Sequence, residues 1–392
     1  MMKQQSVWKT MSKPHRYITV DIFLAYLVMG IYLILIGSAL PSMKAEYHIS
    51  YQTGGLMMSA QQIGYLTMGL LTSTIAAKFG AKRSYLITEA FALIGLALMM
   101  FFGNPWVLLF AMLLTGLAKG CTGNFGNQIV SNVSGGDAGM LNLAQAFFAV
   151  GACAAPIIAL VCGASWRMSF VICIVTGVIV LLHGVRVHIG HAEFAQEAQG
   201  KTDFGFFRHK LFWLCVLMLL SYLAVETCFM GWTVTYFVDS GTVDEPTAQM
   251  MATLLWVAVL IGRFGSAYLS ARFQPHHMIL AMIAGMIVCF TLLMFGNTFV
   301  LMAIGTMGCG MFMGGMYGTT LGGSDDLMER YPMCMGMFIA IPGAGAALTS
   351  SIVGTLADRV GIRNGMLFLY VLIVLLAIVS VLFAIYHEKK NA

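Results

Sequence analysis

The sequence predicts an all-α membrane protein with twelve transmembrane helices in two six-helix bundles, and three observations carry this prediction. Of the 392 residues, 59% are apolar and only 9% are charged, whereas soluble domains carry about 25% charged residues. The mean hydropathy is +0.85. A spanning helix needs about 20 apolar residues, so twelve spans fit the length and leave no room for a large soluble domain.

Apolar runs between polar breaks give the twelve spans in order. The first run continues at full spanning length, so we expect no cleavable signal peptide. Most connectors are short, which favours antiparallel neighbours. The spans cover residues 18–41, 53–77, 84–102, 106–128, 140–162, 167–185, 211–238, 246–270, 277–295, 299–321, 333–356 and 365–386.

One connector is long and polar, and it divides the chain. The stretch HAEFAQEAQGKTDFGFFRHK ends at Lys210 and separates six spans from six. We therefore predict an N-terminal bundle over 1–190, a cytoplasmic linker over 191–208 and a C-terminal bundle over 209–392.

Lys and Arg are distributed unevenly between the connectors. With a cytoplasmic N-terminus, fifteen of them lie on the inner side and four on the outer side, namely Lys44, Arg167, Arg359 and Arg363. This bias marks cytoplasmic loops, so the net charge of +5 does not indicate a nucleic-acid partner. We expect a multi-pass protein of a bacterial inner membrane, with both termini in the cytoplasm and the lipid bilayer around it.

A weak internal repeat supports the span count. The connectors after spans 2, 5, 8 and 11 read AAKFGAKRSYLI, CGASWRMSFVI, SARFQPHHMIL and ADRVGIRNGMLF. Each places a basic residue in a tight turn before a new apolar helix. A three-span unit used four times, in two parallel halves, is the plan of a secondary transporter whose halves rock around a central site.

With this pattern the chain resembles the major facilitator superfamily. The signature of that family between spans 2 and 3 falls here on Ser73, Ala77, Lys78, Gly80, Ala81, Lys82 and Arg83. Its first glycine and its carboxylate are missing, which puts the family's charge latch in question; the resemblance makes Lys78, Lys82 and Arg83 gating candidates. A second copy matches the signature more fully and lies between spans 11 and 12. It consists of Gly354, Asp358, Arg359, Gly361 and Arg363. It is either an echo of the internal repeat or a sign that the spans are misnumbered.

Three further stretches are similar to the fucose/glucose permease branch of that superfamily. They are LNLAQAFFAVGACAAP (141–156), AVETCFMGWTVTYF (224–237) and WVAVLIGRF (256–264). The resemblance implies a sugar–cation symporter that works as a monomer, with a proton or sodium as the coupling ion. Two departures stand against it: span 1 lacks a carboxylate in LILIGSALP (33–41), and Gln145 fills a place where His is frequent in the branch.

Four ionisable residues lie well inside spans, where they usually face the bundle interior. They are Glu89, Lys119, Glu226 and Arg263. Glu89 and Lys119 reach similar depth, so they can form a structural ion pair; alternatively, Lys119 offers its charge to an anionic solute. Arg263 either snorkels toward the cytoplasm or serves as a gate.

Glu226 is the leading proton-coupling candidate, with Glu89 the second. Burial in a desolvated cavity disfavours the charged form of a carboxylate, which allows it to carry a proton. Trp232 and Tyr236 follow on a nearby helix face and form a candidate aromatic platform for a sugar.

Neutral polar residues complete the predicted substrate site. Amides both donate and accept hydrogen bonds, which suits a polyol, but they serve equally as contacts between helices. Trp256 is the candidate stacking residue in span 8. The remaining candidates are Gln61, Asn124, Asn127, Gln145 and Tyr317.

Several motifs argue against catalysis, metals and cofactors. The glycine runs of spans 4 and 10 lack the phosphate-loop pattern and instead let helices approach and slide. Hydrolase motifs are absent, and the nine Cys include no CxxC pair. His183, His188 and His191 are expected to be solvated loop residues, and Asp21 a solvated residue at the membrane surface. We expect no enzyme, no cofactor and no metal.

The prediction is therefore a secondary active transporter of a small polar solute, a sugar or related metabolite, driven by a proton or another cation. Two alternatives within transport stay open: an exporter of amphiphilic compounds, and an organic-anion transporter that uses Lys119. A membrane-embedded sensor or enzyme without transport is the remaining one.

Overall fold

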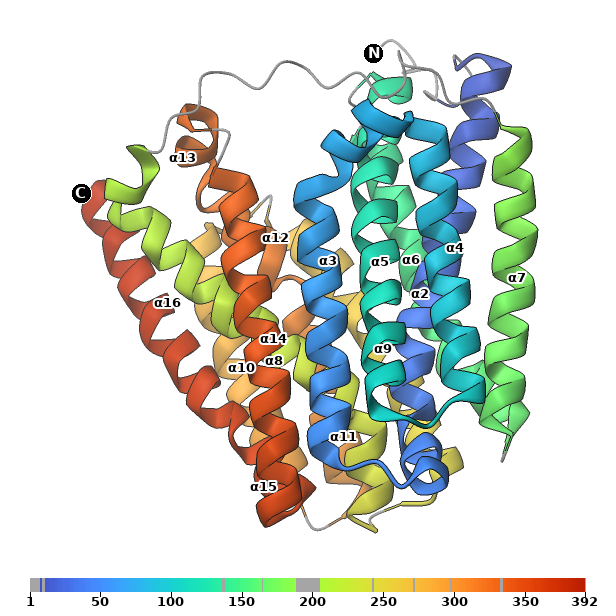
Figure 1. Cartoon of the computed structure of the whole chain (residues 1–392). Helices are drawn as coiled ribbons and strands as arrows, with labels where there is room; N and C mark the ends of the chain where they lie inside the picture. The colour runs from blue at the N-terminus through green and yellow to red at the C-terminus, as the bar shows by residue number, and fades with distance from the viewer. Residues whose placement is uncertain are drawn as a thin grey trace. The chain divides into compact units, whose positions relative to one another are not determined.

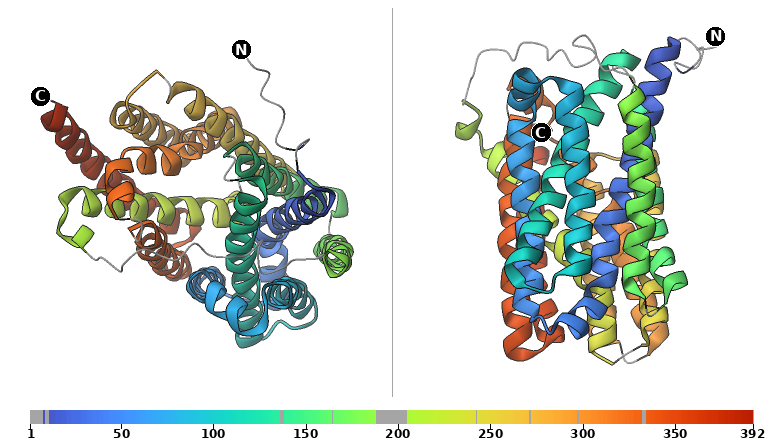
Figure 2. Two further views of the ribbon diagram at one scale, coloured as in Figure 1. Left: turned by 90° about the horizontal axis from the view of Figure 1, so that it is seen from above. Right: turned by 45° about the vertical axis from the view of Figure 1, so that its right-hand side comes forward.

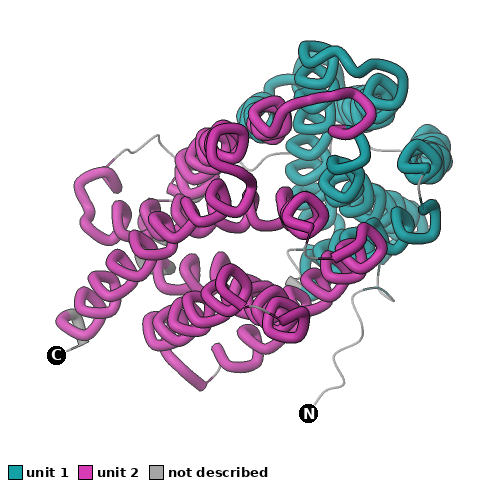
Figure 3. Tube along the Cα trace, turned by 90° about the horizontal axis from the view of Figure 1, so that it is seen from below, with its two compact units in different colours: residues 1–43, 60–198 teal, residues 44–59, 199–392 magenta. Residues whose placement is uncertain are grey.

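A computed structural model describes residues 8, 11–135, 138–163, 165–187, 205–241, 243–270, 272–296, 298–331 and 334–391. Its regular structure over these ranges is helical throughout (Figure 1). The chain forms two compact units, residues 1–43 with 60–198, and residues 44–59 with 199–392 (Figure 3). The bundle and linker boundaries given above, at residues 190 and 208, remain a prediction. Residues 188–204, which include most of the expected linker, lie outside the described residues.

The helices of the first half are each long enough to span a bilayer. The helix α4 lies beside α5 and α7 (Figure 2), and the core of this unit contains Tyr26, Tyr32, Tyr85, Phe125 and Phe170. The bounds are α2 Lys13–Tyr47, α3 Tyr51–Phe79, α4 Ala81–Phe101, α5 Pro105–Ser134, α6 Ala138–Cys162 and α7 Trp166–Arg186.

The second half repeats this pattern with two of its spans broken. Its core contains Phe212, Phe229, Trp232, Phe290 and Phe338. A short 3-10 helix η2 (Gly205–Arg208) precedes α8 Lys210–Asp239, α9 Glu245–Leu269, α10 Pro275–Phe295, α11 Phe299–Gly314, α12 Met316–Gly322, α13 Asp325–Arg330, α14 Cys334–Val360, α15 Ile362–Leu367 and α16 Leu369–Asn391.

The predicted fold class is confirmed, and each predicted span is helical. Each of the twelve apolar runs corresponds to one long helix or to a consecutive pair, α11 with α12 and α15 with α16. Eleven helical segments of the described chain are long and apolar enough to cross a membrane. The exception is α3, whose spanning stretch carries amides and hydroxyls.

Glycines bring equivalent helix pairs together in the two halves. A Cβ added to Gly116 of α5 would lie 2.0 Å from the Gln61 carbonyl oxygen of α3, and one added to Gly314 of α11 would lie 2.3 Å from the Val259 carbonyl oxygen of α9. Real Cβ atoms do not approach so closely, so only glycine allows these backbones to touch. The close approach predicted for the glycine runs of spans 4 and 10 is confirmed.

The repeat seen in the connectors is also present in the contacts. Lys82, Arg167 and Arg363 are each the second residue of their helix. Their side chains donate to the carbonyl oxygens of Val185 (2.7 Å), Met100 (2.9 Å) and Met294 (2.9 Å), respectively. Each acceptor lies in the last turns of a helix. A cation thus joins a helix start to a helix end at three of the four connectors of the repeat. We call each of these connectors, with the helix ends beside it, a corner of the repeat.

The motif copy around Asp358 is an echo of the repeat and does not reflect a misnumbered span. It lies between α14 and α15, which are spans 11 and 12. Gly361 there has φ of +86° and Gly80, after span 2, has φ of +87°. Glycine adopts this backbone at little cost, so both turns need it before their helix begins.

Candidate functional site

A polar cluster in the first unit contains the two ionisable residues predicted for spans 3 and 4. The Thr122 hydroxyl of α5 donates to the Glu89 carboxylate of α4. The Lys119 ammonium of α5 donates to Gln62 Oε1 of α3 at 3.1 Å. It also lies 4.5 Å from the centroid of the Tyr65 ring, a cation–π distance. Two neutral groups of α3 therefore contact this cation.

The predicted amides of the first unit bridge helices. Gln61 donates to Thr115 Oγ1 (3.0 Å) and Asn124 donates to the Gly69 carbonyl oxygen (3.0 Å), both between α3 and α5. Asn127 accepts from the Tyr26 hydroxyl at 2.9 Å. Gln61, Asn124 and Asn127 therefore make contacts between helices, which was one of their two expected roles. Their contact with a solute remains a prediction. Gln145 of α6 is exposed.

A second polar cluster lies in the other unit, around Glu226. The Tyr222 hydroxyl donates to Glu226 Oε1 at 2.6 Å, one helical turn away on α8. Arg263 of α9 and Tyr317 of α12 both interact electrostatically with Tyr222. The carboxylate and one phenol are therefore in direct contact, and a guanidinium and a second phenol act electrostatically on that phenol from two other helices. Such groups can hold a proton and bind hydroxyl groups of a solute.

The predicted aromatic residues of α8 and α9 are buried. Trp232, Tyr236 and Trp256 are exposed by only 0%, 3% and 4%. The Trp232 ring lies 6.1 Å from that of Tyr51. Among the described residues its buried indole N–H has no hydrogen-bond partner, and such a group costs about 1–3 kcal/mol.

The gating candidates differ in their surroundings. Lys82 donates to Val185, as described above, and the Lys78 ammonium lies 5.6 Å from the Phe79 ring centroid. Arg83 is exposed, whereas Arg263 is partly buried. None of these contacts tests a gating role.

Two expectations about the ends of spans 1 and 6 were wrong. Asp21 is 1% exposed and not solvated. A hydrogen bond of 2.7 Å joins its Oδ1 to His183 Nδ1, and the Tyr85 hydroxyl donates to its Oδ2 at 3.3 Å. His183 belongs to α7 and not to a loop. Composition gives the depth of a residue along a helix but not the helix that faces it. His188 and His191 lie outside the described residues.

A third polar cluster, at the start of α3, was not predicted. It lies in the unit that contains residues 44–59. Asp239 binds the Lys44 ammonium at 2.7 Å and accepts from the Tyr51 hydroxyl at 2.8 Å. The Asp358 carboxylate accepts from the backbone N–H groups of Tyr51 (2.8 Å) and Gln52 (2.7 Å). It therefore caps α3 from another helix, where a negative charge is favourable.

The same stretch of α3 is held further along by α14. Ser59 donates to the Ala347 carbonyl oxygen at 2.5 Å and lies 2.9 Å from the Ser351 hydroxyl. A Cβ on Gly55 would lie 2.4 Å from the Ser350 carbonyl oxygen. The sequence signal was present, since Asp358 belongs to the motif copy, but the sequence did not reveal what it binds.

The chain is similar in sequence to known membrane proteins. The family model for the Major Facilitator Superfamily matches residues 22–332. Major facilitator superfamily domain-containing protein 4A of Danio rerio is 27% identical over 135 residues, which are 34% of this chain and 26% of that protein. The chain thus spans about a quarter of that relative's length. The Glucose/mannose transporter GlcP of Bacillus subtilis (strain 168) is 21% identical over 346 residues, 84% of this chain and 85% of that protein.

Solved structures give the same fold. A bacterial homologue of the human lysosomal transporter Spinster superimposes with a TM-score of 0.81 at 14% identity, over 95% of this chain and 97% of that one. The Major Facilitator Superfamily transporter FucP superimposes with a TM-score of 0.63 at 18% identity, over 95% and 99%. At these identities the likeness establishes the fold alone.

Proposed function

This chain belongs to the Major Facilitator Superfamily and is a multi-pass transporter rather than an enzyme, and we propose that it moves a small polar solute of the sugar type by alternating access. We further propose that a proton drives this transport and that the protein works as a monomer in a bacterial inner membrane, with both termini in the cytoplasm. The relative named as a glucose/mannose transporter, aligned over most of both chains, supports the sugar class.

The observation that carries this proposal is the cluster of Tyr222, Glu226, Arg263 and Tyr317. A carboxylate that exchanges between a phenol donor and a guanidinium can hold a proton in one state and release it in another. The phenol hydroxyls both donate and accept hydrogen bonds, so they suit the hydroxyls of a polyol. No metal or nucleotide is needed for this chemistry.

The polar cluster at the start of α3 supports a proposal for how the transport cycle is gated. The segment Lys44–Ser59 packs within the second unit, held by Asp239, Asp358 and Ser351. In our proposal this is the closed form of an outer gate, and opening separates the start of α3 from α14. The glycine contacts between these helices allow them to meet without intervening side chains.

The test is transport by purified protein in liposomes. A panel of labelled hexoses, pentoses, nucleosides and organic acids is offered with and without an inward proton gradient. We expect accumulation of a neutral polyol only when the gradient is present. Accumulation that follows a sodium gradient instead, or efflux of amphiphilic dyes without sugar uptake, would contradict the proposal.

A second candidate function rests on Lys119. Its ammonium donates to Gln62 Oε1 and lies 4.5 Å from the Tyr65 ring centroid, and a cation inside a membrane span can attract an anionic solute. Uptake of organic acids in the same panel, abolished by Lys119→Gln, would favour this candidate over the sugar.

A further inference from the structure

The fourth corner of the repeat differs in chemistry from the other three. At those corners the second residue of a helix is Lys82, Arg167 or Arg363, and it donates to a carbonyl at the end of a neighbouring helix. At the fourth corner the second residue of α10 is His276. The cation of that connector, Arg272, instead donates to the Tyr268 hydroxyl four residues earlier.

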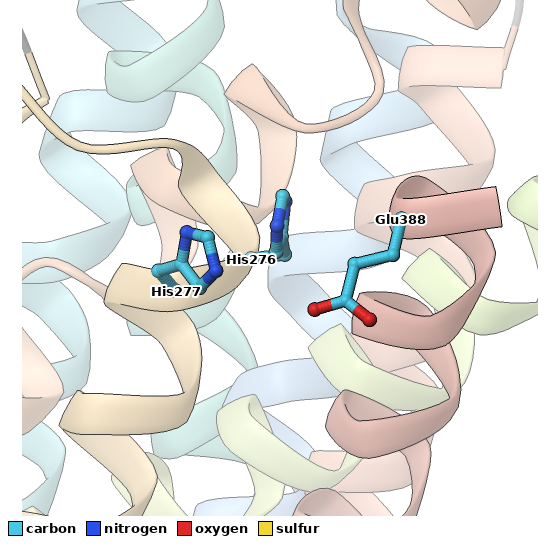
Figure 4. Close-up of side chains that lie close together, drawn as sticks. All are labelled: His276, His277 and Glu388. Carbon is cyan, nitrogen blue, oxygen red and sulfur yellow. The ribbon is translucent and has the colours of Figure 1, made fainter. Parts of the chain in front are cut away.

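Two imidazoles and a carboxylate meet at this corner. His276 and His277 lie in the first turn of α10, and Glu388 lies near the end of α16. One ligating atom from each residue lies within 4.8 Å of the other two. Figure 4 shows the carboxylate of Glu388 directed from α16 toward the two histidines.

The two histidines are held differently. His276 is 3% exposed, and its ring lies parallel to that of His387 on α16, 5.7 Å away with 8° between the planes. The His277 ring lies 4.2 Å from that of His276. His277 and Glu388 are exposed. One ligand is therefore fixed by packing, while the other two are accessible to an ion arriving from solvent.

We propose that His276, His277 and Glu388 bind a divalent transition metal ion of the Zn²⁺ type. Imidazole nitrogen and carboxylate oxygen are ligands of such ions at about 2.0–2.2 Å, usually in tetrahedral geometry with water at an open position. In that geometry neighbouring ligand atoms are about 3.3 Å apart, so no pair of these three atoms needs to close by more than about 1.5 Å. The bound ion supplies the positive charge that Lys or Arg supplies at the other corners.

The consequence is a metal-dependent tie between the start of α10 and the end of α16. Metal binding to a folded site stabilises the folded state, because the unfolded chain does not preassemble the ligands. This site is independent of the solute and coupling ion proposed above, so transport activity is not needed to test it.

The test is a titration of tag-free, chelator-stripped protein in detergent with Co²⁺, followed by displacement with Zn²⁺. We expect about one Co²⁺ per chain with the intense visible bands of four-coordinate Co²⁺, and an increase in unfolding temperature on adding Zn²⁺. His277→Ala and Glu388→Gln should each weaken Co²⁺ binding by at least about tenfold. The matched controls His48→Ala and Glu46→Gln replace exposed residues elsewhere and should bind as the wild type does.

Several outcomes would overturn the proposal. Binding that is equal in all variants, or that shows only the weak bands of six-coordinate Co²⁺, would mean an adventitious ion only. Should His277→Ala fail to fold in chelator, Glu388→Gln decides alone, because it keeps the shape of an exposed side chain. Normal folding of that variant with undiminished Co²⁺ affinity would exclude Glu388 as a ligand.

Discussion

At the scale of single residues, the sequence reveals the ionisable side chains inside apolar helices more readily than it reveals their partners. Glu89, Lys119, Glu226 and Arg263 stand out in the sequence alone, because charge at membrane depth is rare and costly. Their partners were harder to find. Tyr222 precedes Glu226 by four residues, so the helical repeat already contained that contact.

Contacts between distant segments could not be read from the sequence. His183 lies 162 residues from Asp21, and Thr122 lies 33 residues from Glu89. A hydropathy pattern fixes where a residue lies along its own helix but not how that helix is rotated toward its neighbours. This is why Asp21 was wrongly placed in water.

Replacing Lys119 separates the two solute classes. Lys119→Gln keeps a side chain that can donate to Gln62 but removes the charge beside the Tyr65 ring. If the solute is a neutral polyol, its binding should change by less than about threefold, because a neutral solute forms no ion pair with the ammonium. Thermal-shift titration with the solute identified in the uptake panel measures this. A loss of more than about tenfold, or about 1.4 kcal/mol, would identify Lys119 as an anion-binding residue.

At the scale of helices, the spans were predicted well and their irregularities were not. Long apolar runs determine that helical structure exists, and every predicted run became one helix or a consecutive pair. The breaks at Gly315 and between α15 and α16 were not predicted, since glycine both continues and interrupts membrane helices. Equally, nothing in the residue pattern of α3 shows that its first nine residues pack with the second unit.

Helix α5 offers a direct comparison of two glycines. A Cβ on Gly116 would meet the backbone of α3, whereas a Cβ on Gly123 of the same helix would meet nothing within 4 Å. Gly116→Ala should therefore destabilise the protein by about 1–3 kcal/mol through overpacking. Gly123→Ala should be neutral or stabilising by up to about 1 kcal/mol, since alanine favours helix.

Thermal unfolding of the two variants in the same detergent checks this prediction. The unfolding temperature should fall for Gly116→Ala and stay level or rise for Gly123→Ala. Equal effects would mean that the close contact between α3 and α5 contributes nothing specific.

The cap on α3 makes a separate prediction about gating. Asp358→Asn removes the negative charge at the helix start, worth about 0.5–1 kcal/mol. A cysteine introduced as Ser351→Cys should then react about two to five times faster with a membrane-impermeant maleimide, after labelling of the native cysteines is subtracted.

The control for this experiment is Asp244→Asn. Asp244 also caps a helix, α9, by accepting from the Thr247 N–H at 3.4 Å, but its bond does not involve α3. Labelling at position 351 should be unchanged in that variant. Equal acceleration in both variants would show that loss of any capping charge loosens the protein.

At the scale of the whole molecule, a three-helix unit used four times accounts for the recurring contacts between helix starts and helix ends. The repeat was visible in four connector sequences, and it was confirmed by the cations that join helix starts to helix ends. The two units differ in their polar clusters. The first contains Lys119 in contact with Gln62 and Tyr65, and the second contains the carboxylate of Glu226 in contact with Tyr222.

The central claim is that Glu226 couples a proton to the solute, and one comparison tests it most directly. Uphill accumulation and downhill counterflow of the identified solute are measured in liposomes for the wild type, for Glu226→Gln and for Glu46→Gln, which alters an exposed carboxylate at the end of α2. We expect Glu226→Gln to lose accumulation and to retain counterflow, with Glu46→Gln equal to the wild type. Equal loss of both activities in a normally folded Glu226→Gln protein would contradict the account, because Glu226 would then bind solute or stabilise the fold without carrying the proton.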